Sequence, residues 1–150
     1  PDSIRFPRPL LHDGSYNFSF SGLKTAVMQF VRKNPVPAES EALYDLCASF
    51  QAAVCEVLVE KTRAAVRDTG IERLVVAGGV ACNSGLRSSM SSFAREVGIE
   101  LYIPSPVFCT DNAAMLGVPA DFYVRNGICD GLGLDARTVW SLDSLAGRIR

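Results

Sequence analysis

Apolar residues recur at two spacings along the chain, and these spacings predict alternating helices and strands. Helical spacing over residues 23–31 predicts one helix, and a longer apolar stripe within 38–69, stopped by Gly70, predicts a second. The same spacing over 86–97 predicts a third helix that ends at Gly98. We interpret the long stripe as a core-packing face rather than a cofactor-binding face.

Short runs of β-favouring residues fall before and between these helices. Residues 16–21 alternate aromatic and polar side chains, which predicts a short half-buried strand. Runs at 73–77 and 100–103 predict two more strands. Because a helix joins the last two strands, we expect them to be parallel. The pattern predicts a helix-rich α/β chain with a short, mostly parallel sheet.

A fourth helix is predicted after residue 110, with Thr110 or Asp111 as its cap. Pro119 falls inside this helix and should kink or split it, because proline removes a backbone donor and crowds the preceding turn. Residues 1–15 are rich in proline, glycine and charge, which indicates an extended connector. Residues 128–150 form a tail of turns and short apolar pieces.

Composition favours a globular core and excludes several classes of function. Hydrophobic residues make up 48% of the chain and the formal net charge is -1, so we expect no broad nucleic-acid surface on this chain alone. No uninterrupted apolar run nears the roughly 20 residues of a membrane helix, and no signal peptide opens the chain, so we expect no membrane association. The cysteines lack CxxC spacing and favour buried free thiols in a reducing cytoplasm: Cys47, Cys55, Cys82, Cys109 and Cys129.

Three turn-to-helix junctions carry the candidate chemistry, at residues 21–25, 78–83 and 109–112. The free N–H groups and dipole of a helix start can face an anion, and glycine allows a close backbone approach. Helix capping alone explains each junction taken singly. Three junctions in one short α/β chain favour a shared ligand crevice.

Single side chains add weaker signals. Asp111 is a candidate ligand for a hard metal ion, but one carboxylate cannot hold a catalytic metal. Lys24 could neutralise a phosphate or be an exposed lysine at a helix start. His12 is the only histidine and is expected to be a solvated loop residue. Without HExxH or G-x-S-x-G, the chain lacks the ligands of a zinc protease and the nucleophile of a serine hydrolase.

The three junctions lie in motifs that resemble a known family. NFSFSGLKTAV at 17–27, VVAGGVACNSGLR at 75–87 and CTDNAAMLG at 109–117 resemble the carboxy-terminal half of the TsaD family. These are tRNA threonylcarbamoyl-adenosine transferases, formerly called O-sialoglycoprotein endopeptidases. The resemblance implies an actin-like ATPase fold, in which two ribonuclease-H-like lobes close over a nucleotide.

The resemblance also implies an activity. The family transfers a threonylcarbamoyl group from its adenylate to the adenosine next to the anticodon of ANN-decoding tRNAs. It implies one divalent metal, iron or zinc, with ATP or threonylcarbamoyl-adenylate as the nucleotide, and partner subunits in the cytoplasm. Asp111 matches the metal-binding aspartate and Asn83 the nucleotide-binding asparagine. Five further residues match positions near the same cleft: Gly78, Gly79, Ser21, Gly22 and Lys24.

The resemblance divides the chain into a connector at 1–15, a nucleotide- and metal-binding portion of a lobe at 16–127, and a tail at 128–150. The family's HxxxH metal motif belongs to an amino-terminal half that this sequence lacks. We therefore expect the chain alone to be catalytically inactive. We also expect it to self-associate through apolar surface that would face the other lobe.

Two positions depart from the family pattern, and two other functions stay open. Gly85 stands where many members carry a larger residue, and Cys82 where a small residue is usual. One alternative is another actin-like ATPase such as a sugar kinase, which would share the glycine pair but not the other two motifs together. The second is a non-catalytic scaffold with a vestigial nucleotide pocket.

Overall fold

The computed structural model describes residues 3–133, 135, 138–139 and 141. The chain divides into two compact units, Pro1–Cys109 and Thr110–Arg150. The boundary falls directly after Cys109, so the CTDNAAMLG motif begins in the first unit and continues in the second.

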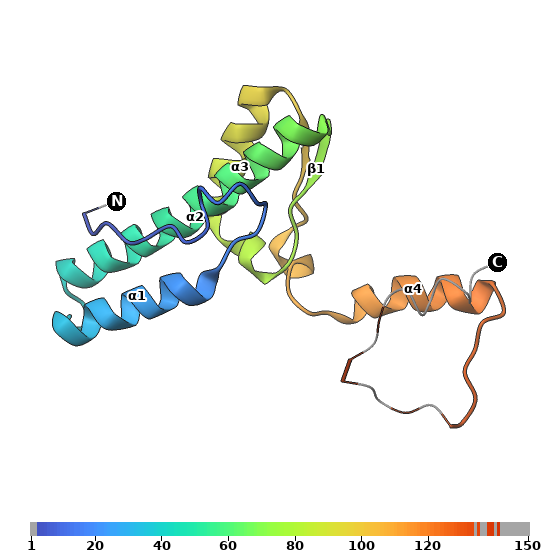
Figure 1. The fold of residues 1–150 in the computed structure, drawn as a ribbon. Coiled ribbons are helices and arrows are strands. Elements are labelled where there is room, and N and C mark those ends of the chain that lie inside the picture. The colour runs from blue at the N-terminus through green and yellow to red at the C-terminus, as the bar shows by residue number, and fades with distance from the viewer. Residues whose placement is uncertain (1–2, 134, 136–137, 140, 142–150) are drawn as a thin grey trace. The chain divides into compact units, whose positions relative to one another are not determined.

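Two helices build the first part of the core. Helix α1 (Phe20–Lys33) and helix α2 (Glu41–Thr69) form where helical spacing predicts them, and Figure 1 shows α1 running beside the first half of α2. The Ser40 side chain accepts a hydrogen bond from the Leu43 N–H, and Gly70 ends α2 in the left-handed conformation that glycine adopts freely. The buried residues of this part come from both helices and from the segment before α1: Phe6, Leu23, Leu46 and Ala53.

The second part of the core lies between α2, α3 and the sheet. Helix α3 (Ser84–Val97) joins strand β1 (Arg73–Val75) to strand β2 (Glu100–Tyr102). The strands are parallel, with Leu74 opposite Leu101, as the αβ spacing predicts. The buried side chains come from α2 and α3: Cys55, Leu86, Met90 and Phe93. These features confirm a helix-rich α/β chain with a short parallel sheet.

An ion pair with a second contact fastens α3 to α2. The Arg63 guanidinium donates to both carboxylate oxygens of Glu96, at 2.8 and 3.0 Å. The same guanidinium carbon lies 4.9 Å from the centre of the buried Phe93 ring. A bidentate pair stacked on an aromatic ring restricts the guanidinium more than an isolated surface pair would. These contacts therefore fix the angle between α2 and α3 from the carboxyl end of α3.

Two short 3-10 turns complete the first unit. The first, η1 (Gly79–Cys82), lies between β1 and α3, and the second, η2 (Pro106–Phe108), follows β2. Both follow the carboxyl end of a parallel strand, which is the edge where α/β folds bind ligands. The glycine pair and the start of the CTDNAAMLG motif are thus carried by equivalent turns.

Two sequence predictions are wrong. No strand forms over 16–21, because α1 already begins at Phe20 and leaves Tyr16 and Phe18 exposed. Asn112, rather than Thr110 or Asp111, caps helix α4 (Ala113–Arg125). Its side chain accepts from the Met115 N–H at 3.2 Å and donates to the Thr110 carbonyl at 2.8 Å. That turn leaves both predicted caps outside the helix.

Pro119 does not split α4, which continues from Ala113 to Arg125 with the proline inside. Many apolar side chains of this helix are exposed, among them Leu116 and Val118. Of the predicted tail at 128–150, the structure describes 128–133, 135, 138–139 and 141, and the rest of that prediction lies outside the described residues.

Helix α2 is, by length and composition only, apolar enough to cross a membrane. The apolar character of α2 is not evident from uninterrupted runs, because polar residues divide its apolar positions and no single run is long enough to cross a membrane. The core helix of a water-soluble protein can meet the same criterion, and here Leu46, Ala53 and Val57 are buried within the first unit. Packing in the core accounts for the buried part of the apolar face of α2.

Candidate functional site

Gly78 and Gly79 form the turn between β1 and α3, which we call the glycine corner, and its backbone conformation requires glycine. Gly78 has φ +90° and ψ 170°, a conformation almost restricted to glycine. The chain then makes the η1 turn, and the Asn83 side chain accepts a hydrogen bond from the Leu86 N–H at 2.9 Å. Asn83 is therefore a helix cap, as capping chemistry predicts.

A pocket of about 500 Å³ joins this corner to α1 and α2. The first and second turn-to-helix junctions meet here, since Lys24 comes from one and Gly79 and Asn83 from the other. Helix α2 forms the wall between them. The residues that line the pocket are Phe20, Lys24, Cys47, Phe50, Gln51, Val54, Gly79, Val80 and Asn83.

The pocket combines an apolar wall with a single charge. Phe20, Phe50 and Val54 offer ring and aliphatic surface, and Lys24 is the only charged side chain among the lining residues. A Cβ added to Gly79 would meet no atom within 4 Å, so the backbone there is open to an approaching group. An apolar surface beside a cation and bare backbone suits a flat, partly anionic molecule.

The other residues predicted near the cleft have different positions. Ser21 and Gly22 lie in the first turn of α1 but do not line the pocket. A Cβ on Gly22 would lie 3.0 Å from the Pro9 ring, so this glycine allows the preceding segment to pack closely on α1. Gly78 sets the direction of the corner through its backbone, and Gly79 is the member of the pair that reaches the pocket.

An amide pair forms part of the pocket wall. The Asn83 Nδ2 donates to Gln51 Oε1 at 3.0 Å, across 32 positions of sequence. Sequence reasoning missed Gln51 because it assigned the long stripe of α2 to the core. That interpretation is incomplete: Cys47, Phe50 and Val54 belong to the stripe and also line the pocket. A polar residue next to the stripe, at Gln51, was the available signal.

Arg87 connects the glycine corner to the turn after β2. Its guanidinium donates to the carbonyl oxygens of Ala81 and Pro104, each at 2.6 Å, and contacts Cys109 Sγ at 3.4 Å. Cys82 Sγ also lies 3.5 Å from the Pro106 carbonyl oxygen. The corner and the turn at 104–109 are thus held together by side-chain contacts within the first unit.

Asp111 lies in the second unit, exposed and two residues before α4. Among the residues that the structure describes, no group of three or more His, Cys, Asp or Glu side chains could hold a metal ion. The donor set around Asp111 in this chain therefore does not fit a complete metal centre. One carboxylate supplies one hard ligand, and a stable site needs several.

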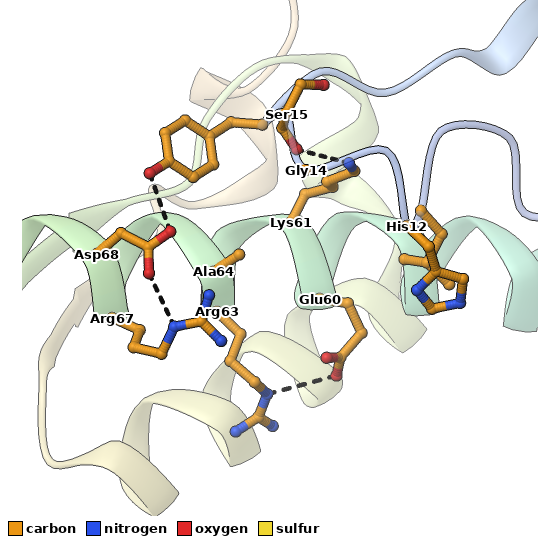
Figure 2. Close-up of a pocket in the computed structure, with 11 residues that line it drawn as sticks. His12, Gly14, Ser15, Glu60, Lys61, Arg63, Ala64, Arg67 and Asp68 are labelled. Carbon is orange, nitrogen blue, oxygen red and sulfur yellow. Dashed lines mark hydrogen bonds and ion pairs between the residues drawn. The ribbon is translucent and has the colours of Figure 1, made fainter.

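A second pocket, of about 380 Å³, lies where the segment before α1 crosses α2 (Figure 2). Its charged side chains largely satisfy one another: Arg67 donates to Asp68 at 2.8 Å, and Arg63 contacts Glu60 at 3.4 Å. The buried Lys61 donates to the Ser15 carbonyl at 2.6 Å. His12 is exposed at one side, as expected for a solvated loop residue. We interpret this pocket as a structural contact.

The cysteines only partly follow the prediction of buried thiols. All five are free, but only Cys55 and Cys109 are buried, while Cys47 and Cys129 are exposed. Burial raises the pKa of the Cys55 thiol, which keeps it protonated and unreactive. Cys47 is exposed at the candidate pocket and is therefore a chemical reporter for its occupancy.

Comparisons with known proteins identify the family of this chain. The family model for TsaD, tRNA N6-adenosine threonylcarbamoyltransferase, matches residues 2–118. Curated proteins of that name from Geotalea daltonii and Geobacter metallireducens are 66% and 64% identical over 146 and 149 residues. These matches cover 97% and 99% of this chain but 43% and 44% of the relatives, so the chain spans less than half their length. The family-model match over most of its length shows that the chain belongs to the TsaD family.

Proposed function

We propose that this chain is the carboxy-terminal part of an enzyme that transfers threonylcarbamoyl from its adenylate to the adenosine next to the anticodon of ANN-decoding tRNAs. The supporting observation is the meeting of the first two junctions at one pocket. Lys24, Gly79 and Asn83 line it together with an apolar wall. A sugar kinase or a vestigial scaffold would not require all three motifs of this family.

The pocket residues suggest how the adenylate is held. The purine ring packs on the apolar wall formed by Phe50 and Val54, and the phosphate lies near the Lys24 ammonium. The open backbone at Gly79 allows an oxygen of the ligand to approach without a side chain intervening. The Asn83 amide supplies an N–H for an acceptor on the nucleoside.

The transfer itself is an acyl substitution at the carbamoyl carbon. The N6 amine of the tRNA adenosine attacks that carbon and loses a proton. The bond from the carbon to the phosphate oxygen breaks, and AMP leaves with the bonding electron pair. Lys24 would stabilise the charge that develops on the leaving phosphate, and the pocket would hold the two reacting atoms in contact.

Several parts of the proposal rest on the family. Two lobes of actin-like fold would close over the nucleotide, and partner subunits and tRNA would bind in the cytoplasm. Asp111 would supply one ligand to an iron or zinc ion, whose chemistry when bound is to polarise an oxygen of the substrate. Since the remaining metal ligands are not among the described residues, we expect the 150-residue chain alone to be inactive. We expect it to self-associate through exposed apolar surface that would face the other lobe.

Alkylation of Cys47 tests whether the pocket holds a nucleotide. In the full polypeptide encoded by the gene, AMP or threonylcarbamoyl-adenylate should cover Cys47 and slow its reaction with N-ethylmaleimide. At ten times the Kd, simple occupancy predicts slowing of about tenfold, measured by peptide mass spectrometry. Cys129 is exposed and does not line the pocket, so it is the internal control.

Equal alkylation rates for Cys47 with and without nucleotide would contradict the nucleotide pocket and favour a scaffold. Protection by ATP and a hexose, without transfer of threonylcarbamoyl to tRNA when partner subunits are present, would favour a kinase. Protection together with transfer would support the proposed function.

A further inference from the structure

We infer that Gln51 is a positioning residue of the pocket, which fixes the orientation of the Asn83 amide, and that Gly85 provides the space for it. The inference rests on the proposed function, because it assumes that Asn83 contacts the nucleotide. Gln51 comes from the middle of α2, whereas Asn83 and Gly85 belong to the start of α3. The pair therefore joins two elements across one wall of the pocket.

The hydrogen bonds determine the polarity of both amides. Asn83 Oδ1 must be the oxygen, because it accepts from the Leu86 N–H at 2.9 Å. The other terminal atom of Asn83 is then the nitrogen, and it donates to Gln51 Oε1 at 3.0 Å. The remaining atom of the Gln51 amide is therefore Nε2. One backbone N–H thus orients two side chains in succession.

Gly85 explains how Gln51 fits. A Cβ at position 85 would lie 3.0 Å from Gln51 Nε2 and 3.1 Å from Asn83 Oδ1, closer than ordinary contact. Any side chain there would push the amide pair by a few tenths of an ångström. Glycine is a poor residue for a helix, and it occupies the second position of α3. The space over Gly85 therefore accommodates the Gln51 amide.

The amide pair presents donors to the pocket. Asn83 Nδ2 has two N–H groups and uses one for Gln51, which leaves the other for an acceptor in the pocket. Donors in such a wall suit the ring nitrogens and ribose oxygens of a nucleoside. Loss of the Gln51 acceptor should therefore weaken adenosine and AMP alike, unlike the loss of a phosphate contact.

Calorimetry with adenosine and AMP tests the inference on the full polypeptide. Gln51→Met keeps the side-chain length but removes the acceptor, and should weaken both ligands about five- to tenfold, the effect of one hydrogen bond. Its Tm should stay unchanged, because the Asn83 cap is retained. Gln51→Glu restores an acceptor for Asn83 Nδ2 and should recover adenosine affinity. Gln29→Met, an exposed glutamine on α1, is the matched control.

Gly85→Ala gives an independent result. It should weaken adenosine binding while leaving the Tm equal or higher, since alanine favours the helix. Combined with Gln51→Met, the total loss should be smaller than the sum of the two single losses. Part of the effect of Gly85→Ala acts through the Gln51 amide, while its Cβ also lies 3.1 Å from Asn83 Oδ1. Additive losses in the double variant would overturn the inference.

The remaining outcomes separate this inference from the proposed function. Wild-type binding with unchanged affinity in Gln51→Met would overturn the positioning role alone. A parallel fall of Tm and affinity in Gln51→Met, without recovery in Gln51→Glu, would show a purely structural contact and overturn it as well. Failure of the wild-type protein to bind either ligand would overturn both the proposed function and this inference.

Discussion

Two adjacent glycines, Gly78 and Gly79, differ in what they contribute to the pocket. Gly78 has φ +90° with ψ 170°, whereas Gly79 begins η1 without a positive φ. A side chain would find open space at both positions. Backbone conformation therefore requires glycine at the first position, and access for a ligand favours it at the second.

Alanine substitutions should separate these two requirements. Gly78→Ala should reduce the free energy of unfolding by about 1–3 kcal/mol, because an L-residue is strained in that conformation. Gly79→Ala should change the free energy of unfolding by less than about 0.5 kcal/mol. Its Cβ should instead weaken AMP binding, as measured by calorimetry. Equal losses of stability in the two variants would contradict this assignment.

At this scale the sequence predicts local contacts better than distant ones. The cap at Asn83 follows from residue type and spacing, because its partner is the N–H of Leu86 three positions later. Its second partner, Gln51, lies 32 positions earlier on another helix. No local pattern records such a pair, and a glutamine beside an apolar stripe looks like a solvated residue.

Among the elements, the turns after β1 and β2 depend on one side chain of α3. Arg87 donates to the carbonyls of Ala81 and Pro104 at 2.6 Å and is half-buried. Removal of the guanidinium would leave these carbonyl groups without their donors. The position of the glycine corner therefore depends on a residue that does not line the pocket.

Arg87→Met should reduce the free energy of unfolding by about 1–3 kcal/mol, the cost of leaving buried acceptors unsatisfied. Amide hydrogen exchange should increase over 79–83 and 104–109 before it increases in α2. Arg95→Met is the control, because Arg95 bonds only to Ser91 and Ser92 within its own helix among the contacts described. Uniform exchange throughout the first unit would contradict a local role.

Periodicity predicts the long elements and fails where aromatic alternation is short. Helices α1, α2 and α3 and both strands lie where spacing places them, with glycine at the ends of α2 and α3. The alternation of Phe18 and Phe20 suggests a strand. In the structure the two rings pack edge to face at the start of α1, with their centres 5.1 Å apart. The helical spacing of apolar residues in α1 extends back to Phe20, so the helix forms in place of the strand that the alternation predicts.

For the whole first unit, the segment before α1 is part of the core and not only a connector. Phe6 is 4% exposed, and Arg8 forms an ion pair with Glu56 on α2 at 2.7 Å. Lys61 is buried and donates to Asp13 at 2.7 Å. The proline, glycine and charged residues of this segment predict an exposed connector, so its packing into the core could not be predicted from its composition.

The Asp13–Lys61 pair should make stability depend on pH. The hydrogen bond from the Lys61 ammonium lowers the pKa of Asp13 from 3.8 to about 2. Because the folded pKa is the lower one, the pair stabilises the fold fully above about pH 4 and loses this effect as the pH falls toward about 2. Thermal unfolding of wild type and Asp13→Asn should differ above pH 4 and converge below it. A difference independent of pH would contradict the ion pair.

The most direct test of the nucleotide site is a crystal structure of the full polypeptide with bound AMP. We expect the nucleotide to occupy the pocket between α1, α2 and η1, in contact with Lys24, Gly79 and Asn83. AMP bound on another surface, with these three residues free of it, would show that this pocket is not the nucleotide site.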